Sequence, residues 1–192
     1  MKTFKDKIAV ITGGGSGIGR ELVRQLASSG CHVATCDVIE ENLQETLTMV
    51  VSESPKVKVT NHICDVSSEE EVVRFKEEVL NQHKTEHINL LFNNAGIGGG
   101  GSFVTSSREE WERCFAVCWY GVYYCSRVFI PHIVSSKEGH VINTSSVNGF
   151  WASLGGTPHT SYSAAKFAVK GFSESLIDDL RVNAPHVNVS VV

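Results

Sequence analysis

A tyrosine and a lysine stand four residues apart, at Tyr162 and Lys166. On a helix, two such positions share one face, with their Cβ atoms ~5–6 Å apart. A free phenol ionises only near about pH 10 and is therefore a poor proton shuttle at neutral pH. A cation ~4 Å away in a partly buried site stabilises the phenolate by about 4 kcal/mol. The spacing predicts proton transfer coupled to hydride transfer, although such pairs are also common on helix surfaces.

Hydroxyl and amide side chains follow two short apolar runs, in residues 93–96 (NNAG) and 143–146 (NTSS). In a doubly wound sheet, ligands lie outside the carboxyl ends of the strands. A serine hydroxyl at that edge can bond a substrate oxygen and stabilise its growing negative charge. Two adjacent serines are also consistent with an ordinary turn.

Glycines are concentrated after the first apolar run, where residues 12–19 read TGGGSGIG ahead of a helix-like stretch. Glycine lets the backbone approach an anion, and a helix N-terminus offers N–H groups to a pyrophosphate. Asp37, which closes the second run, can accept both ribose hydroxyls of an adenosine, or it is a solvated turn residue. A 2′-phosphate ~4 Å from its carboxylate costs about 4 kcal/mol per charge pair before screening. Val38 and Ser16 supply no cation, and the direction of Arg20 is not fixed by the sequence, so we expect NAD.

These residues must be positioned by alternating strands and helices. Short β-branched runs predict strands at residues 8–11, 33–34, 57–59, 88–92, 141–142 and 187–192. Helical patterns lie between them, at residues 21–27, 40–51, from Ser67, from Ser107 to about Val134 and from Thr157 to about Val182. Such alternation predicts a parallel sheet covered by helices on both faces.

The composition is that of an ordinary globular domain, with 42% hydrophobic and 20% charged residues in 192. A net charge of −4 gives no basic surplus for a nucleic acid. No apolar run approaches the ~20 residues of a membrane span, and residues 1–7 do not fit a secretory signal. We expect a single dinucleotide-binding and catalytic domain over residues 1–192, located in the cytoplasm.

Six cysteines are present, and none forms a Cys-x-x-Cys pair. Cys114, Cys118 and Cys125 are spaced by four and seven residues, on one side of a helix. We expect small buried side chains there and no metal, because zinc usually requires tighter thiolate pairs or interleaved histidines.

Together, these motifs resemble the short-chain dehydrogenase/reductase family over nearly the whole chain. The glycine segment matches the family's cofactor motif and Asp65-Val66 its adenine-side motif. Residues 93–96, the Ser146 region and the Tyr162–Lys166 pair then follow in the family's order. The resemblance implies an α/β fold with a Rossmann-type doubly wound parallel sheet. It also implies an NAD-dependent oxidoreductase that acts on a secondary alcohol or ketone, or alternatively a non-catalytic dinucleotide-binding or scaffold protein.

The resemblance implies a role for each matching residue. Tyr162 would be the general acid or base, and Lys166 would hold the nicotinamide ribose and favour ionisation of the phenol. Ser146 would orient the substrate oxygen, with Ser145 as the second choice, and Asn94 would mainly brace the sheet. The implied cofactor contacts are Gly13, Gly15, Ser16, Gly17, Ile18, Gly19, Asp37, Asp65, Val66, Asn93, Ala95, Gly96, Tyr162 and Lys166.

Two features within the chain depart from the family's pattern, a residue type and a spacing. Cys118 stands where the family has an asparagine that keeps a water in the proton relay. A thiol is a weak donor and acceptor, so either the relay is weakened or a backbone carbonyl holds the water. The Ser146–Tyr162 spacing is also long, and the extra residues are expected within 149–160. There Phe150 and Trp151 would wall an apolar substrate pocket or pack on the next helix.

A third departure is that the chain ends at Val192, where family members usually continue with a substrate-covering loop and a last strand. We expect both to be absent, so that these residues alone bind NAD weakly and turn over slowly. The resemblance implies a homodimer or homotetramer, with the fourth and fifth helices paired across a two-fold axis. It leaves the small-molecule substrate unidentified.

Overall fold

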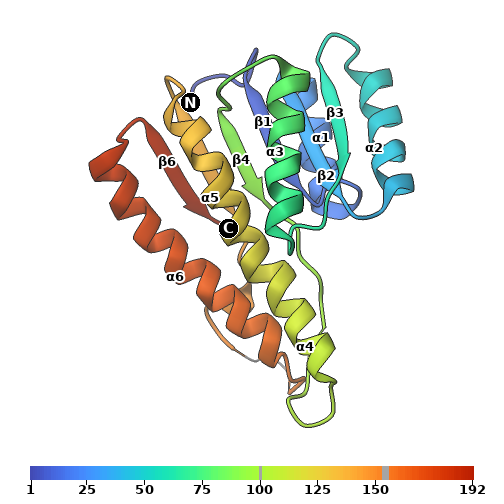
Figure 1. Ribbon diagram of the computed structural model, residues 1–192, viewed down its shortest axis with the longest axis vertical. Coiled ribbons are helices and arrows are strands. Elements are labelled where there is room, and N and C mark those ends of the chain that lie inside the picture. Colours follow the sequence, from blue (N-terminus) through green and yellow to red (C-terminus); the bar gives the residue numbers. More distant parts are fainter. Residues whose placement is uncertain (100, 153–155) are drawn as a thin grey trace.

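The computed structural model describes residues 1–99, 101–152 and 156–192. Within these ranges, parallel strands form one sheet in the order β3-β2-β1-β4-β5-β6 (Figure 1). The strands are β1 (Ile8–Thr12), β2 (His32–Asp37), β3 (Val59–Ile63), β4 (Leu90–Asn93), β5 (Gly139–Asn143) and β6 (Val187–Val191). The strand order reverses between β1 and β4, which confirms the predicted doubly wound fold. A ligand crevice is expected outside the carboxyl ends of these two strands.

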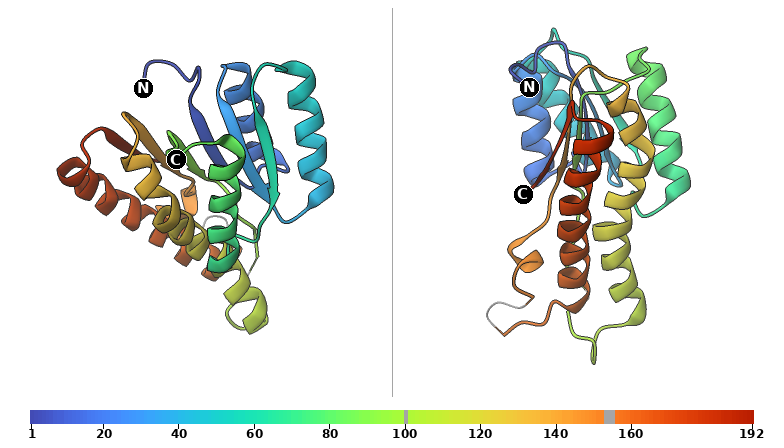
Figure 2. Two further views of the ribbon diagram at one scale, coloured as in Figure 1. Left: turned by 45° about the horizontal axis from the view of Figure 1, so that its top comes forward. Right: turned by 90° about the vertical axis from the view of Figure 1, so that its left-hand side faces the viewer.

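Helices cover both faces of the sheet (Figure 2). They are α1 (Gly17–Ser28), α2 (Glu40–Glu53), α3 (Glu69–His83), α4 (Arg108–Phe115), α5 (Gly121–Val134) and α6 (Thr160–Asn183). Successive side chains of β1 point to opposite faces. Ile11 packs in one core cluster with Val23 of α1, and Val10 packs in the other with Phe75 of α3 and Phe129 of α5. Both faces of the sheet are therefore buried.

A π-helical turn, Ala116–Tyr120, joins α4 and α5 end to end. A capping box begins α4, because Ser107 Oγ accepts from Glu110 N while Glu110 Oε2 accepts from Ser107 N. Turns of this kind often occur at functional sites. Cys118 lies inside the turn and is fully buried.

Several predicted boundaries are wrong, among them that of the first helix, which begins at Gly17 and not at residue 21. The strand expected at residues 57–59 begins at Val59 and continues through polar residues to Ile63. The helix expected from Ser67 is capped by Ser68 instead, because the Ser67 hydroxyl donates to Asp65 Oδ1 at 2.7 Å. The helix expected from Thr157 begins three residues later. Among the described residues, no helix is long and apolar enough to cross a membrane.

Candidate active site

The loop between β1 and α1 packs tightly against the start of the helix. A Cβ atom on Gly19 would lie 1.9 Å from Gly13 O, so no other residue fits there without moving the loop. Within the described part of the chain, Ser16 at the N-cap makes no side-chain hydrogen bond to α1. The first N–H groups of α1 are therefore suited to an anion such as a pyrophosphate.

A cavity of about 420 Å³ lies in front of this loop. It is lined by Gly13 and residues 16–19, by residues 36–39 at the end of β2, by residues 64–66 after β3 and by residues 94–97 after β4. The cavity thus collects most of the predicted cofactor residues at one edge of the sheet. Arg113 and Val117 also line it, and neither was among the predicted cofactor contacts.

Asp37 lies at the rim of the cavity with its carboxylate held by backbone N–H groups. Oδ2 accepts from Gly15 N at 3.0 Å, and Oδ1 accepts from Val38 N at 2.8 Å and Ile39 N at 3.2 Å. Arg20 points towards α2, where its guanidinium pairs with Glu45 Oε2 at 2.7 Å. The carboxylate is therefore oriented by the backbone and not by this arginine.

Lys166 connects α6 to the end of β5. Its side chain is buried, and Nζ donates to Thr144 O at 2.7 Å while lying 5.5 Å from the centroid of the Tyr162 ring. A Cβ atom on Gly96, which lines the cavity, would lie 3.7 Å from this Nζ. Burial lowers the pKa of Lys166, against the opposing effect of the Cys118 and Cys114 thiols. The ammonium group is thus close both to the Tyr162 ring and to Gly96 in the wall of the cavity.

The two adjacent serines after β5 have different surroundings. Ser145 is buried, and its hydroxyl donates to Lys166 O at 3.0 Å, which ties β5 to α6. Ser146 is half-buried, and its hydroxyl oxygen accepts from Asn148 N at 3.2 Å. Ser145 is therefore occupied in packing, which favours Ser146 as the serine that meets a substrate.

The two asparagines after β4 also differ in position. The Asn93 side chain is buried and donates to Ser126 Oγ at 3.0 Å and to Asn143 Oδ1 at 2.8 Å. Asn94 lines the cavity and donates to Thr12 O at 3.1 Å. The Asn93 side chain therefore braces the sheet and is turned away from the cavity, contrary to its expected contact with the cofactor.

The Cys118 thiol donates to Ile97 O at 3.3 Å, and Cys114 Sγ lies 3.6 Å from the same oxygen. A hydrogen bond between the two thiols lowers the pKa of Cys114 and raises the pKa of Cys118. Cys118 thus holds the backbone of a residue that lines the cavity. Among the described residues, no group of three or more histidine, cysteine or acidic side chains could hold a metal ion.

The long segment between Ser146 and Tyr162 is partly described, and residues 153–155 lie outside the described residues. Phe150 and Trp151 are 52% and 64% exposed. Lys170 of α6 places Nζ 5.2 Å from the Phe150 ring centroid, so the ring contacts α6 through this lysine.

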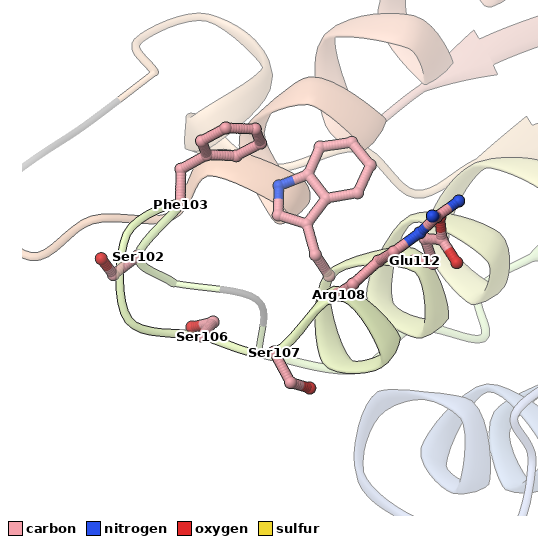
Figure 3. Close-up of a pocket in the computed structure, with 7 residues that line it drawn as sticks. Ser102, Phe103, Ser106, Ser107, Arg108 and Glu112 are labelled. Carbon is pink, nitrogen blue, oxygen red and sulfur yellow. The ribbon is translucent and has the colours of Figure 1, made fainter.

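Trp111 fixes the start of α6 to α4, next to a second cavity of about 440 Å³ (Figure 3). Its indole Nε1 donates to Thr160 Oγ1 at 3.0 Å, and the Ser161 hydroxyl donates to Trp111 O at 2.6 Å. Because Tyr162 follows these two residues, the contacts hold the first turn that carries the phenol.

The family model for short chain dehydrogenases matches residues 7–192. A short-chain dehydrogenase/reductase from Burkholderia phymatum, solved in complex with NAD, superposes with a TM-score of 0.90 and 35% identity, covering 100% of this chain and 66% of that one. A metagenomic short-chain oxidoreductase in complex with NADP gives a TM-score of 0.86 and 31% identity, over 98% of this chain and 81% of that one.

A relative in sequence is meso-2,3-butanediol dehydrogenase from Serratia marcescens, 32% identical over 186 residues, with 94% of this chain and 70% of the relative covered. The chain thus spans about two thirds of the length of the Burkholderia protein and somewhat more of the other two. The sequence match covers nearly every described element, and the matched structures share its sheet. The chain belongs to the short-chain dehydrogenase/reductase family.

Proposed function

We propose that this protein is an NAD-dependent oxidoreductase that transfers a hydride between a nicotinamide cofactor and a secondary alcohol or ketone. The observation that carries the proposal is the position of Lys166. This buried ammonium is bonded to the carboxyl end of β5, lies 5.5 Å from the Tyr162 ring and is next to the wall of the cavity.

The residues around the cavity suit a dinucleotide. The start of α1 would hold the pyrophosphate, Asp37 the adenosine ribose, and Asp65 and Val66 the adenine side. When bound, the nicotinamide supplies the hydride acceptor or donor of the reaction. Lys166 would bind its ribose at the end near Gly96.

The remaining chemistry belongs to three side chains. Tyr162 would move the proton between the substrate oxygen and solvent, acting as general base in oxidation and general acid in reduction. Lys166 would stabilise the phenolate through its positive charge. Ser146 would donate a hydrogen bond to the substrate oxygen and stabilise the negative charge that develops there.

The preference for NAD over NADP rests on Asp37. Its carboxylate faces three N–H groups, and the nearby Arg20 is paired with Glu45. A 2′-phosphate would meet this negative charge at a cost of about 4 kcal/mol per charge pair at ~4 Å before screening.

The test compares Tyr162→Phe with Tyr123→Phe, a matched change at a tyrosine that is 39% exposed on α5. Nicotinamide absorbance reports turnover with a panel of secondary alcohols and ketones, and calorimetry reports NAD binding. We expect Tyr162→Phe to lose nearly all turnover and to keep NAD affinity, while Tyr123→Phe changes neither. Near-normal turnover in Tyr162→Phe would exclude Tyr162 as the proton shuttle.

A non-catalytic dinucleotide-binding or scaffold role is the second candidate. The observation that favours it is Cys118, whose thiol takes the family's asparagine position and is bonded to Ile97 O. Tight NAD binding without turnover on any substrate of the panel would support this role.

We also propose how the protein assembles and where in the cell it is located. We propose a homodimer or homotetramer paired through α5 and α6, where Phe167 of α6 is 42% exposed. Light scattering on the purified chain measures the assembly. All six cysteines are free thiols, which supports a reducing, cytoplasmic location.

A further inference from the structure

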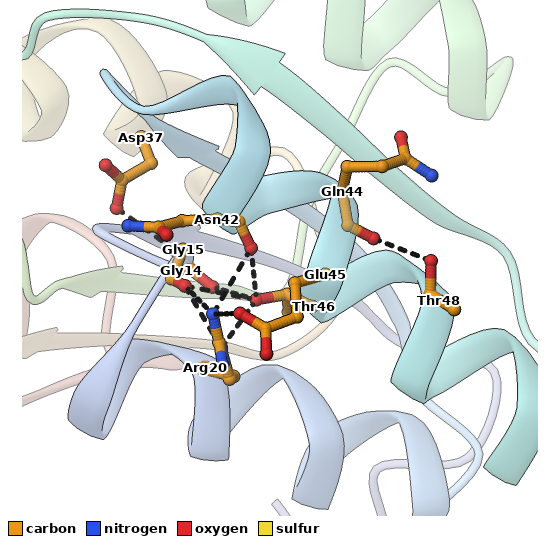
Figure 4. Close-up of polar contacts among 9 residues, drawn as sticks. All are labelled: Gly14, Gly15, Arg20, Asp37, Asn42, Gln44, Glu45, Thr46 and Thr48. Atoms are coloured by element: carbon orange, nitrogen blue, oxygen red, sulfur yellow. Dashed lines mark hydrogen bonds and ion pairs between the residues drawn. The ribbon is translucent and has the colours of Figure 1, made fainter.

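The glycine loop is bonded by two side chains that do not line the cavity, those of Thr46 and Arg20 (Figure 4). Thr46 of α2 is fully buried, and its hydroxyl is shared between Gly14 O and Asn42 O, each at 3.0 Å. Arg20 donates to Gly15 O from Nε at 3.0 Å and from Nη2 at 2.5 Å. It also donates from Nε to the Thr46 hydroxyl at 3.0 Å. Two consecutive carbonyls of the loop are thus held by one connected group.

The first of these carbonyls links Thr46 to Asp37. Gly14 O and Gly15 N belong to the same peptide unit, whose C=O and N–H groups point in opposite directions. Thr46 bonds the oxygen, and Asp37 Oδ2 accepts from the N–H at 3.0 Å. The threonine therefore sets the plane of the peptide that orients the carboxylate.

The space around this peptide has no room for a side chain at either glycine. A Cβ atom on Gly15 would lie 2.8 Å from Asp37 Oδ2 and 3.0 Å from Asn42 Cβ. A Cβ atom on Gly14 would lie 1.8 Å from Thr35 Oγ1. A side chain at either position would therefore displace the peptide, and a rotated peptide would lose its bonds to both Thr46 and Asp37.

The positive charge of Arg20 is paired with a carboxylate on α2. Its Nη2 lies 2.7 Å from Glu45 Oε2, and its side chain is 20% exposed. A guanidinium that is fixed by a carboxylate and a backbone carbonyl is a poor partner for a phosphate in the cavity. Glu45 thus keeps the Arg20 guanidinium away from a 2′-phosphate in the cavity.

We propose that Thr46 and Arg20 are positioning residues that set the choice between NAD and NADP. They act through the Gly14–Gly15 backbone to hold the Asp37 carboxylate at the ribose edge of the cavity. The inference rests on the proposed function, because it assumes that a dinucleotide binds with its adenosine ribose beside Asp37. A purely structural brace would change the stability of the protein but not the ratio of its two dinucleotide affinities.

The test compares Thr46→Val with Thr48→Val by calorimetric titration of each variant with NAD and with NADP. Both hydroxyls reach the carbonyl four residues earlier in α2, but Thr48 is exposed and its hydroxyl donates to Gln44 O at 2.8 Å, away from the glycine loop. Loss of one net hydrogen bond predicts an NAD Kd about fivefold higher in Thr46→Val. The NADP Kd stays constant or falls, so the ratio of the two shifts towards NADP, and Thr48→Val leaves both values unchanged.

Arg20→Lys and Arg20→Gln provide a second measurement that does not depend on the folding of Thr46→Val. Lysine keeps the charge and one contact, so its ratio of affinities should lie between those of wild type and Arg20→Gln. If all folded variants kept the wild-type ratio of NAD and NADP affinities, this inference would be wrong while the proposed function would stand. Wild-type protein that binds neither dinucleotide would overturn the proposed function and the inference together.

Discussion

Replacing Lys166 with methionine removes the ammonium group and keeps a side chain of similar length. At 5.5 Å from the Tyr162 ring centroid, and with an effective dielectric constant of ~20, one unit charge stabilises a phenolate by about 3 kcal/mol. Removing that charge should lower kcat at neutral pH by on the order of a hundredfold. The loss should shrink near about pH 10, where a free phenol ionises unaided.

Folding should survive this change because two effects offset each other. The variant loses the 2.7 Å hydrogen bond to Thr144 O, but it also removes a buried charge whose desolvation lowers the pKa of Lys166. We expect a net change of about 1 kcal/mol, or about 2–4 °C in Tm.

The assay is kcat against pH for Lys166→Met and for the control Lys170→Met. Lys170 lies one turn further along α6 and pairs with Glu174 at 2.6 Å. Wild-type kcat in Lys166→Met at neutral pH, or an equal loss in both variants, would refute the electrostatic role of Lys166.

Three further changes test separate parts of the site. Ser146→Ala should lower kcat about a hundredfold with Tm unchanged, whereas Ser145→Ala should mainly lower the free energy of unfolding, by about 1 kcal/mol; the reverse pattern would exchange the two serines. Gly19→Ala should lower NAD affinity at least about tenfold, as its Cβ would lie 1.9 Å from a loop carbonyl, while Gly98→Ala meets open space and should not; equal affinities would contradict the packing argument. Burial lowers the pKa of His83 to about 4 from 6.5, so the unfolded chain binds more protons between these values and stability falls as pH falls through them. The free energy of unfolding, measured with urea at several pH values in this range, should fall less steeply with falling pH in His83→Gln than in the wild type. An unchanged pH dependence would exclude His83 as its source.

The sequence allowed the order of the elements to be predicted, because each buried strand leaves an apolar, β-branched run. The bounds of β3 were predicted wrongly, because its residues Thr60, Asn61 and His62 are polar. His62 is nevertheless buried, since Glu78 Oε2 lies 2.7 Å from its Nδ1 and Thr60 Oγ1 lies 2.9 Å from its Nε2. A polar strand whose bonds are satisfied by α3 leaves no hydrophobic signal.

Side-chain directions were the part of the site that spacing could not supply. Arg20 was equally consistent with facing a phosphate or a neighbouring helix, and its direction depends on Glu45, twenty-five residues away in the chain. Asn93 and Asn94 are adjacent and identical in type, yet only Asn94 lines the cavity. Such choices depend on contacts between distant segments, which a motif does not record.

The central claim is that this chain transfers a hydride to or from a bound nicotinamide with Tyr162 as its proton shuttle. The most direct measurement is deuterium transfer to NAD from secondary alcohols deuterated at the carbinol carbon, followed by mass spectrometry. The account predicts deuterium-labelled reduced NAD with the wild-type protein and only a trace with Tyr162→Phe. Wild-type protein that binds NAD but yields no labelled product from any alcohol, or a Tyr162→Phe variant that yields as much as wild type, would contradict it.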